Sequence, residues 1–464
     1  MSSEKDSTRH SSPVKVALAS FIGTSIEYYD FFIFGTAAAL VFPQLFFPQT
    51  SPVVGTLLAF ATLGVGFLAR PLGGVLFGHF GDRVGRKKML VISLVGMGLA
   101  TLGMGLMPTY AQIGLLAPIL LTVLRLFQGL MVGGEWGGAV LMAVEHAPKG
   151  RKGFYGSFPQ TGAPVGVALA TVSFLAISNL PDEQFLSWGW RLPFLASALL
   201  VLVGLVIRMS IAESPAFAAA REKQSLVKVP LVEAFKRHPK EIFLIAGTYL
   251  SQGVIAYIAM SYLVNYGSTV VGLQRGDTLM GVLVGAVVAA VLTPVFGAVS
   301  DTWGRKTVYF LGALMILLTI VPGFMLINSG AVPGFVAGVV VMYGIATAPA
   351  CGTTGSLFSM VFSREVRYTG ASVGYTISQI AGPAFAPMIA TSLYAAFGTS
   401  DAVVIYLLVI AAISVLSVSL LPGGWGKAEA RYNQEIMDRE SDGEWSKAKE
   451  HETTPLPVPE STKA

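Results

Sequence analysis

The sequence predicts an all-α membrane protein with 12 transmembrane helices in two related halves of six. Three observations support this expectation. Hydrophobic residues make up 53% of the 464 residues and charged residues only 12%, whereas soluble domains carry roughly 25% charged residues. Twelve apolar stretches recur along the chain, and one polar motif occurs once in each half. A soluble protein could not shield so much apolar surface from water, so we expect the lipid bilayer to surround the chain.

A transmembrane helix needs about 20 apolar residues to cross the hydrocarbon core. The first apolar stretch is too long for a signal-peptide core and contains acidic residues, so we expect a helix and not a cleaved leader. The chain also holds 52 Gly and 25 Pro, which membrane helices tolerate where they pack closely or bend. The expected spans are 16–43, 53–77, 88–107, 114–143, 154–178, 190–210, 242–264, 279–299, 307–327, 332–360, 369–392 and 402–421.

Basic residues predict the orientation of these spans. One set of loops carries clusters of Lys and Arg, such as 83–88 and 221–240, while the alternate loops hold only Arg275, with Arg191 at a span edge. The positive-inside rule therefore places both termini in the cytoplasm of a cell-membrane protein. The expected organisation is a cytoplasmic N-terminal segment 1–15, an N-terminal half 16–210, a cytoplasmic loop 211–241, a C-terminal half 242–421 and a disordered cytoplasmic tail 422–464.

Composition excludes several functional classes. A single cysteine, Cys351, rules out a disulfide framework and a cysteine metal site, and all five histidines lie in polar segments or loops. The segment 304–307 lacks the glycine spacing of a phosphate-binding loop. The formal charge of +5 sits in short loops between apolar stretches, which is typical of a membrane protein and not of a nucleic-acid-binding protein. We therefore expect no enzyme activity, cofactor, metal or nucleic-acid partner.

The polar motif G-x-x-x-D-x-x-G-R-K follows both the second and the eighth expected span, and its two copies lie 219 residues apart. One copy alone could be an ordinary charged turn. Two copies at matching places indicate duplicated halves, which are typical of transporters. The glycines permit a tight turn, and the aspartate can accept hydrogen bonds at the start of a helix. The motif residues are Gly78, Asp82, Gly85, Arg86 and Lys87 in the first copy and Gly297, Asp301, Gly304, Arg305 and Lys306 in the second.

The paired motif resembles the signature of the major facilitator superfamily. This resemblance implies the major facilitator fold, and it implies that the motif residues, together with the nearby Arg70, latch the two halves on the cytoplasmic side. Segments 26–31, 69–74, 125–136, 188–194 and 213–215 narrow the resemblance to the metabolite:H⁺ symporter family, over about 14–421. That family carries α-ketoglutarate, citrate, shikimate, and proline or betaine.

Two further segments and the tail indicate which branch of that family the chain resembles. Segment 182–191 is most similar to the shikimate-type branch, and the tail lacks the heptads of the osmosensing betaine branch. The fifth span contains Gly162-Ala163-Pro164, where antiporters of the superfamily have adjacent Gly and Pro. This favours symport over exchange.

Ionisable residues inside a membrane are costly and are therefore candidates for function. The expected spans contain five of them away from their ends, all in the N-terminal half: Glu27, Asp30, Arg70, Arg125 and Glu135. Because spans seven to twelve contain none, we expect the proton-coupling group to be Asp30, Glu27 or Glu135.

Helical geometry suggests where these residues lie. Glu27 and Asp30 are three residues apart on one helix face near mid-membrane. Arg125 and Gln128 share a stripe with Glu135, which we expect to face a central cavity. Arg125 and Gln128 would contact the substrate there, with Tyr28 nearby. The structural alternatives are that Glu135 pairs with a basic group such as Arg70 and that Arg125 neutralises the acids of the first span.

Neutral polar side chains in the C-terminal half are further candidates for the substrate site. Tyr249 and Gln252 share one helix face, as do Tyr375 and Gln379. They could hydrogen-bond a substrate across the cavity, or they could join helices.

These observations predict a monomeric, proton-coupled secondary transporter that imports a small organic acid by alternating access, with protons and a carboxylate as its partners. A carrier of a zwitterion such as proline or betaine, or of a neutral solute, is the first alternative. A non-transporting receptor is the second, although it would need a ligand-binding domain that the sequence lacks.

Overall fold

A computed structural model describes residues 13–84, 86–133, 135–210, 230–362, 366–422 and 425. Helices are the regular elements of these residues, and ten helical segments among them are long and apolar enough to cross a membrane. The helices α1 (Pro13–Leu40) and α4 (Arg86–Leu106) complete the twelve expected spans. The predicted all-helical membrane fold is therefore confirmed.

The N-terminal half contains the first six spans. Its other long helices are α3 (Pro52–Val84), α6 (Leu116–Val132) followed by α7 (Glu135–Glu145), α8 (Lys152–Ile177) and α10 (Arg191–Ser210). Short helices connect the spans: α2 (Phe42–Phe46), α5 (Tyr110–Ile113), α9 (Asp182–Gln184) and the π-helical η1 (Phe185–Gly189).

The C-terminal half contains the other six spans and is preceded by α12 (Pro230–Arg237). Two of its spans contain a π-helical turn, η2 (Ile258–Tyr262) or η3 (Val340–Ile345). The α-helices are α13 (Pro239–Tyr257), α14 (Leu263–Thr269), α15 (Arg275–Trp303), α16 (Arg305–Ile327), α17 (Val332–Val339), α18 (Ala348–Val361), α19 (Arg367–Ala381), α20 (Ala386–Phe397) and α21 (Asp401–Leu420).

Two expected spans are interrupted. The fourth breaks between α6 and α7 at Gly133, where a Cβ atom would lie 2.3 Å from the carbonyl oxygen of Arg70. The eleventh breaks between α19 and α20, over residues 382–385, which include Pro383. The close approach of α3 leaves room only for glycine at the first break, and a proline without an N–H group contributes to the second. A hydropathy profile detects neither helix break, because the residues at the breaks are apolar or small.

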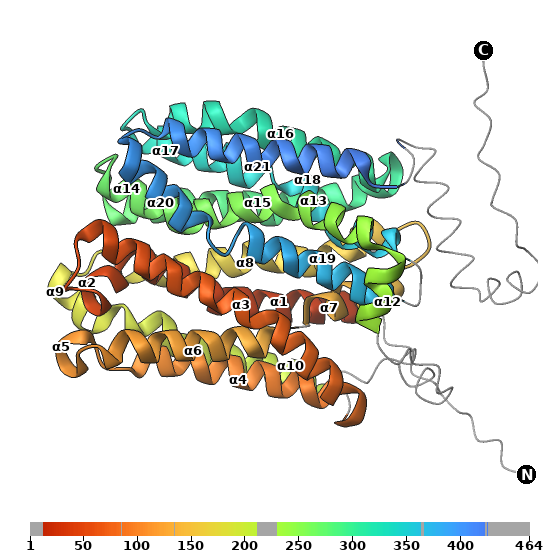
Figure 1. Ribbon diagram of the computed structural model, residues 1–464, viewed down its shortest axis with the longest axis horizontal. Helices are drawn as coiled ribbons and strands as arrows, with labels where there is room; N and C mark the ends of the chain where they lie inside the picture. Colours follow the sequence, from red (N-terminus) through yellow and green to blue (C-terminus); the bar gives the residue numbers. More distant parts are fainter. Residues whose placement is uncertain are drawn as a thin grey trace, which may run out of the picture.

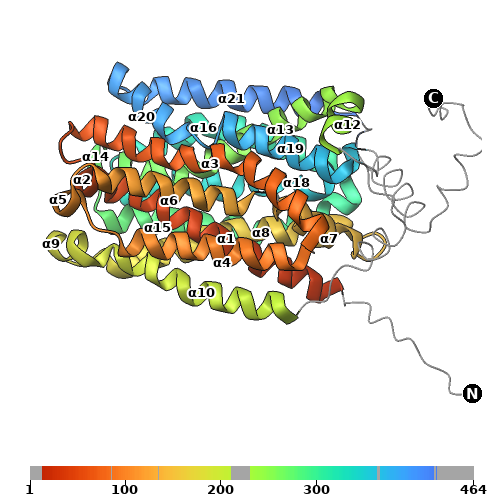
Figure 2. The ribbon, with the colours of Figure 1, turned by 60° about the horizontal axis from the view of Figure 1, so that its bottom comes forward.

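The spans form one bundle, with the helices α4, α6 and α10 on one side and α16, α17 and α21 on the other (Figure 1). Between them, α1, α3, α7 and α8 face α13, α15, α18 and α19, and a turned view keeps α10 and α21 on opposite sides (Figure 2). We call the end that holds the junctions α3–α4 and α15–α16 the motif end and the opposite end the far end. Among the described helices, α1 begins and α21 ends at the motif end (Figure 1).

Glycines bring α3 and α6 into contact. A Cβ atom on Gly129 would lie 1.9 Å from the carbonyl oxygen of Gly66, which shows how closely the two backbones approach. Small residues at such contacts are typical of membrane helices. A Cβ on Gly66 would also lie 2.7 Å from Nε of Arg125. The glycine therefore leaves room for a guanidinium group inside the N-terminal half.

Candidate functional site

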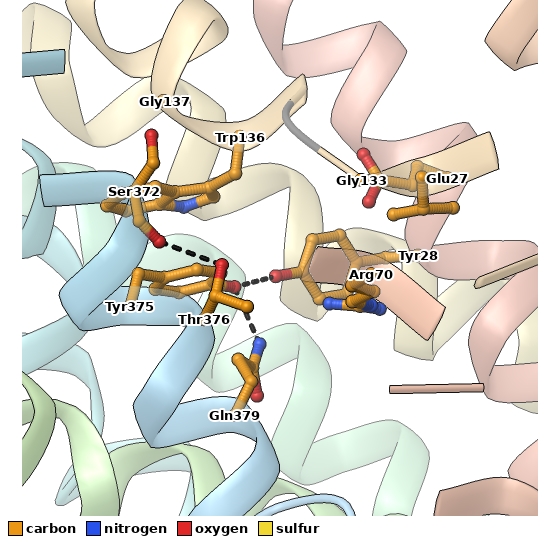
Figure 3. Close-up of a pocket in the computed structure, with 11 residues that line it drawn as sticks. Glu27, Tyr28, Arg70, Gly133, Trp136, Gly137, Ser372, Tyr375, Thr376 and Gln379 are labelled. Carbon is orange, nitrogen blue, oxygen red and sulfur yellow. Dashed lines mark hydrogen bonds between the residues drawn. The ribbon is translucent and has the colours of Figure 1, made fainter. Parts of the chain in front are cut away.

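A small cavity lies where the two halves meet at the middle of the bundle. Residues of α1, α3, α6 and α7 line it from the N-terminal half, and residues of α19 line it from the C-terminal half (Figure 3). Five of the expected site residues line it, namely Glu27, Tyr28, Arg70, Tyr375 and Gln379. Its volume of about 30 Å³ suffices for one or two water molecules.

Tyr375 closes the cavity against two residues of the other half. Its phenol oxygen lies 2.7 Å from that of Tyr28 and accepts a 2.7 Å hydrogen bond from Nε2 of Gln379. Its ring stacks on Trp136, with parallel planes and centroids 4.0 Å apart. Nε1 of Trp136 donates a 2.8 Å hydrogen bond to Gln160, which fixes the indole plane. Sequence reasoning gave Trp136 no role, although it directly follows the acidic candidate Glu135.

Arg70 lies beside this cavity (Figure 3). The residue is 8% exposed, and its Cζ atom lies 4.2 Å from the ring centroid of Phe31 and 4.3 Å from that of Phe67. Among the residues that the structure describes, Arg70 forms no ion pair, and its Nε atom has no hydrogen-bond partner. The sequence placed Arg70 with the latch, whereas the structure places it between the halves. Its expected pairing with Glu135 lies outside the described side chains.

Asp30 and Arg125 occupy the interior of the N-terminal half, and both are fully buried. Thr101 donates a 3.0 Å hydrogen bond to Oδ2 of Asp30, and Ser197 donates to Oδ1. Nε2 of Gln128 donates to Thr101 at 2.9 Å, and Nη1 of Arg125 donates to Oε1 of Gln128. Asp30 and Arg125 are therefore connected through Gln128 and Thr101 and not by a direct ion pair. Neither residue lines the cavity, in contrast to the expected orientation of Arg125 and Gln128.

The ring of Phe31 is shared by two guanidinium groups. The Cζ atom of Arg125 lies 4.0 Å from its centroid, so the Cζ atoms of Arg70 and Arg125 are at most about 8 Å apart. Two like charges at this distance repel by roughly 2 kcal/mol at an effective dielectric constant of 20. Nε and Nη2 of Arg125 have no hydrogen-bond partner among the described residues. The buried carboxylates of Glu27, on the same cavity as Arg70, and of Asp30, in the same half as Arg125, offset part of this repulsion.

Glu27 and Asp30 lie in different surroundings although they are three residues apart on α1. Glu27 is buried at the cavity between the halves, whereas Asp30 points to Thr101 of α4 and Ser197 of α10. Residues three apart on a helix differ by about 60° in direction. This angle is enough to separate a residue on the cavity from one inside the N-terminal half.

The polar residues of α13 have different positions. The Tyr249 ring lies 4.7 Å from that of Tyr375, directly behind the cavity. Oε1 of Gln252 accepts hydrogen bonds from Tyr309 at 3.3 Å and from Thr354 at 3.0 Å. Gln252 thus joins three helices of the C-terminal half, which fits the structural alternative for this residue.

The second motif copy contacts the N-terminal half at the motif end. Asp301 accepts hydrogen bonds from the backbone N–H groups of Gly153, at 2.6 Å, and Phe154, at 3.0 Å, in the first turn of α8. Arg305 forms an ion pair with Asp301 at 3.2 Å, and Gly304 adopts a positive φ of 91° at the turn. A carboxylate at a helix N-terminus is electrostatically favourable.

Gly297 and Lys306 of the second motif copy also contact neighbouring segments. Gly297 packs on Ser157 of α8, and Nζ of Lys306 donates to the carbonyl oxygen of Leu421 at 2.6 Å. Much of the first motif copy lies outside the described part of the structure. This concerns Gly85 and the side chains at Gly78, Asp82, Arg86 and Lys87.

The halves also touch at the far end. Arg275 of α15 forms an ion pair with Asp182 of α9 and lies over the Phe185 ring, with Cζ 3.8 Å from its centroid. Nδ2 of Asn265 donates a 3.1 Å hydrogen bond to the carbonyl oxygen of Ala39. Contacts between the halves therefore occur at both ends of the bundle.

Comparison with known proteins gives concordant matches. The family model of the Major Facilitator Superfamily matches residues 20–382. The chain is 43% identical to the shikimate transporter of Escherichia coli K12, over 88% of this chain and 94% of that one. It is 41% identical to the inner membrane metabolite transport protein YhjE of the same organism, over 90% and 96%. It is 32% identical to the proline/betaine transporter of Salmonella typhimurium, over 87% and 82%.

Solved structures agree on the fold. The xylose transporter XylE from Escherichia coli superimposes with a TM-score of 0.67 at 17% sequence identity, covering 89% of this chain and 98% of that one. At this level of identity the similarity concerns the arrangement of the helices and not the substrate.

Proposed function

The chain belongs to the major facilitator superfamily, and from this premise we propose that it is a proton-coupled symporter that imports a small organic acid by alternating access. It is a multi-pass membrane transporter and not an enzyme. The observation that carries the proposal is the buried guanidinium of Arg70, which borders the cavity between the halves without an ion-pair partner among the described residues.

Arg70 suits a carboxylate substrate. A guanidinium group can hold a carboxylate through two parallel hydrogen bonds, and its charge is costly inside a membrane until an anion compensates it. Arg125, at most about 8 Å away across Phe31, adds to the positive potential. We therefore assign the substrate carboxylate to Arg70, which lines the cavity, and not to Arg125. The relative named for shikimate, a carboxylic acid, supports this substrate class.

Asp30 is the candidate proton carrier. Two hydroxyl groups donate to its carboxylate, and one of them must turn when Asp30 takes up a proton and becomes a donor. The hydrogen-bonded path through Thr101 and Gln128 leads to Arg125. An anion bound at Arg70 would change the electric field at Arg125. The hydrogen-bonded path would then transmit this change from Arg125 to Asp30. Glu27, on the cavity itself, is the second candidate.

Alternating access would use the contacts at the two ends. The Asp301 contact with α8 closes the motif end, and the ion pair between Asp182 and Arg275 closes the far end. The distribution of basic residues favours a cytoplasmic motif end, with both termini in the cytoplasm. In this scheme the halves, 16–210 and 242–421, rock about the cavity, and substrate and proton leave when the motif end opens.

A zwitterion carrier is the alternative that one observation favours. The cavity is bordered by the aromatic rings of Tyr28, Trp136 and Tyr375, which could hold a quaternary ammonium group through cation–π contacts. The proline/betaine relative supports this possibility.

Uptake into proteoliposomes separates the two substrate classes. Labelled mono- and dicarboxylic acids, proline and glycine betaine are each offered with an inside-alkaline pH gradient and again after a protonophore. We expect accumulation of at least one carboxylic acid that the protonophore abolishes. Accumulation of betaine alone would contradict the organic-acid assignment.

A further inference from the structure

Lys306 of the second motif copy is held at the end of the last span. Its Nζ atom donates a 2.6 Å hydrogen bond to the carbonyl oxygen of Leu421, the residue that follows α21. The same atom lies 4.4 Å from the ring centroid of Trp425, and the lysine is 3% exposed. A buried ammonium group is costly unless such partners compensate its charge. The end of α21 and the residue Trp425 beyond it therefore stabilise this cation.

Trp425 covers the start of α16. Its ring meets that of Phe310 edge to face, with centroids 5.4 Å apart and planes at 85°. Lys306 and Phe310 are four residues apart on α16, so they share one face of the helix. Trp425 thus contacts two successive turns of α16, which packs beside α21 (Figure 1). Together, Leu421 and Trp425 tie the end of the last span to the first turns of α16.

The latch contact with the N-terminal half begins one residue away from Lys306. Arg305 pairs with Asp301, whose carboxylate accepts hydrogen bonds from two N–H groups of α8. Gly304, with its positive φ of 91°, forms the turn between Asp301 and the two basic residues. Successive residues of a helix point about 100° apart, so Arg305 can face the acid while Lys306 faces α21. The rotation of α16 about its axis therefore sets both contacts together.

We propose that Trp425 is a positioning residue of the latch at the motif end. By covering Lys306, it fixes the start of α16 against α21 and keeps Arg305 directed at Asp301. Loss of the indole would release Lys306 and let the turn between α15 and α16 shift, so the motif end would open more often. The inference rests on the proposed latch role of Asp301 and is independent of which solute is carried.

Thiol labelling of the full chain in proteoliposomes measures this opening without a substrate. Cys351, the only cysteine, is buried, and its Sγ atom lies 3.7 Å from the carbonyl oxygen of Gln160 in the other half. A thiol-specific maleimide should therefore label it faster when the halves separate more often. The variants are Trp425→Ala, Trp425→Phe, Asp301→Asn and the double variant of Trp425→Ala with Asp301→Asn. Thermal melting confirms that each variant is folded.

Two further variants complete the set. Trp303→Ala is the matched control, because Trp303 lies at the same end of the bundle and is 52% exposed, compared with 48% for Trp425. A tryptophan that only anchors the protein at the membrane surface would respond as Trp303 does. Phe310→Leu removes the ring on which Trp425 packs and probes the same contact from the side of α16.

Trp425→Ala should raise the labelling rate roughly two- to fivefold, which corresponds to the loss of one cation–π contact. Trp425→Phe should return the rate close to that of the wild type, because a phenyl ring can still cover Lys306. Phe310→Leu should raise the rate less than Trp425→Ala, and Trp303→Ala should leave it unchanged. Wild-type labelling in a folded Trp425→Ala variant, with fast labelling in Asp301→Asn, would overturn the inference and leave the latch intact.

The double variant separates a positioning role from a structural one. If Trp425 acts through the latch, Trp425→Ala should cause no further increase once Asp301→Asn has removed the latch charge. A further increase by the same factor would show that Trp425 acts independently of Asp301, and it would overturn the inference. Wild-type labelling in Asp301→Asn would overturn the proposed latch itself and, with it, the role of Trp425.

Discussion

The phenol oxygens of Tyr28 and Tyr375 lie 2.7 Å apart, and the hydrogen bond between them joins α1 of the N-terminal half to α19 of the C-terminal half. Tyr375 also stacks on Trp136, so one side chain of the C-terminal half closes the cavity against two residues of the other half. A substrate must break these contacts to enter. Together with the contacts at the two ends, their strength would contribute to how often the empty transporter opens.

Tyr28→Phe should increase the population of open states. The variant loses one buried hydrogen bond, worth about 0.5–1.5 kcal/mol, and this corresponds to a change of roughly two- to tenfold. Cys351, the only cysteine, reports opening because it is buried and its Sγ atom lies 3.7 Å from the carbonyl oxygen of Gln160 in the other half. A thiol-specific maleimide should label it faster in Tyr28→Phe.

Tyr29→Phe is the matched control for this measurement. The Tyr29 hydroxyl donates a 2.8 Å hydrogen bond to the carbonyl oxygen of Pro193 within the N-terminal half. Its loss should leave the labelling rate of Cys351 unchanged. Equal rates in the wild type and Tyr28→Phe would show that the tyrosine contact does not hold the halves together.

Arg70→Gln should nearly eliminate binding of the acid substrate, with a loss of about 2–5 kcal/mol for a desolvated charge pair. Arg70→Lys should weaken binding less, because an ammonium group keeps the charge but not the bidentate geometry. Isothermal titration measures both. Arg191→Lys is the control, since Arg191 donates to the carbonyl oxygens of Gly105 and Met107 away from the cavity. Wild-type affinity in Arg70→Gln would remove Arg70 from the substrate site.

Asp30→Asn should abolish proton-driven accumulation and leave exchange of substrate across the membrane. Asparagine keeps the shape of the side chain and still accepts from one hydroxyl group, but it cannot take up a proton. Uptake and counterflow assays in the same proteoliposomes separate the two activities. Gln128→Leu, which interrupts the path from Arg125 to Thr101, should slow accumulation while Asp30 is intact. Unchanged accumulation in Asp30→Asn would transfer the proton-carrying role to Glu27.

Asp301→Asn should slow transport and leave substrate binding in detergent nearly unchanged. The substitution removes the charge that pairs with Arg305 and weakens the acceptor for the two N–H groups of α8. Transport rates and titrations measure the two effects. Asp277→Asn, in the first turn of α15 at the far end, is the control. Loss of binding in a folded Asp301→Asn variant would contradict a latch at this end.

Hydropathy and the repeated motif were sufficient to predict the spans and the two halves, because each depends on the local sequence alone. The position of Arg70 was harder to predict, since its closeness to the first motif copy in sequence suggested the latch. Arg70 lies 14 residues before the end of α3 at Val84, which is about 21 Å at 1.5 Å per residue. The length of the helix therefore separates it from the motif end.

The contacts that build the site depend on how helices are rotated against one another. Periodicity placed Arg125 and Gln128 on one face of α6 but could not decide whether that face meets the cavity or the interior of its own half. The packing of Gly66 against Gly129 sets this rotation and turns Arg125 toward Phe31. The pairing of Trp136 with Tyr375 requires the placement of both halves, which no local pattern contains.

Simultaneous measurement of acid and proton movement tests the proposed coupling most directly. Proteoliposomes that contain the wild type and an internal pH-sensitive dye receive the transported acid from outside, without a preset pH gradient. The account predicts internal acidification that accompanies uptake of the labelled acid and is absent in Asp30→Asn. Uptake of the acid by the wild type without proton movement would contradict the proposed coupling. Equal acidification by the wild type and Asp30→Asn would contradict the role of Asp30.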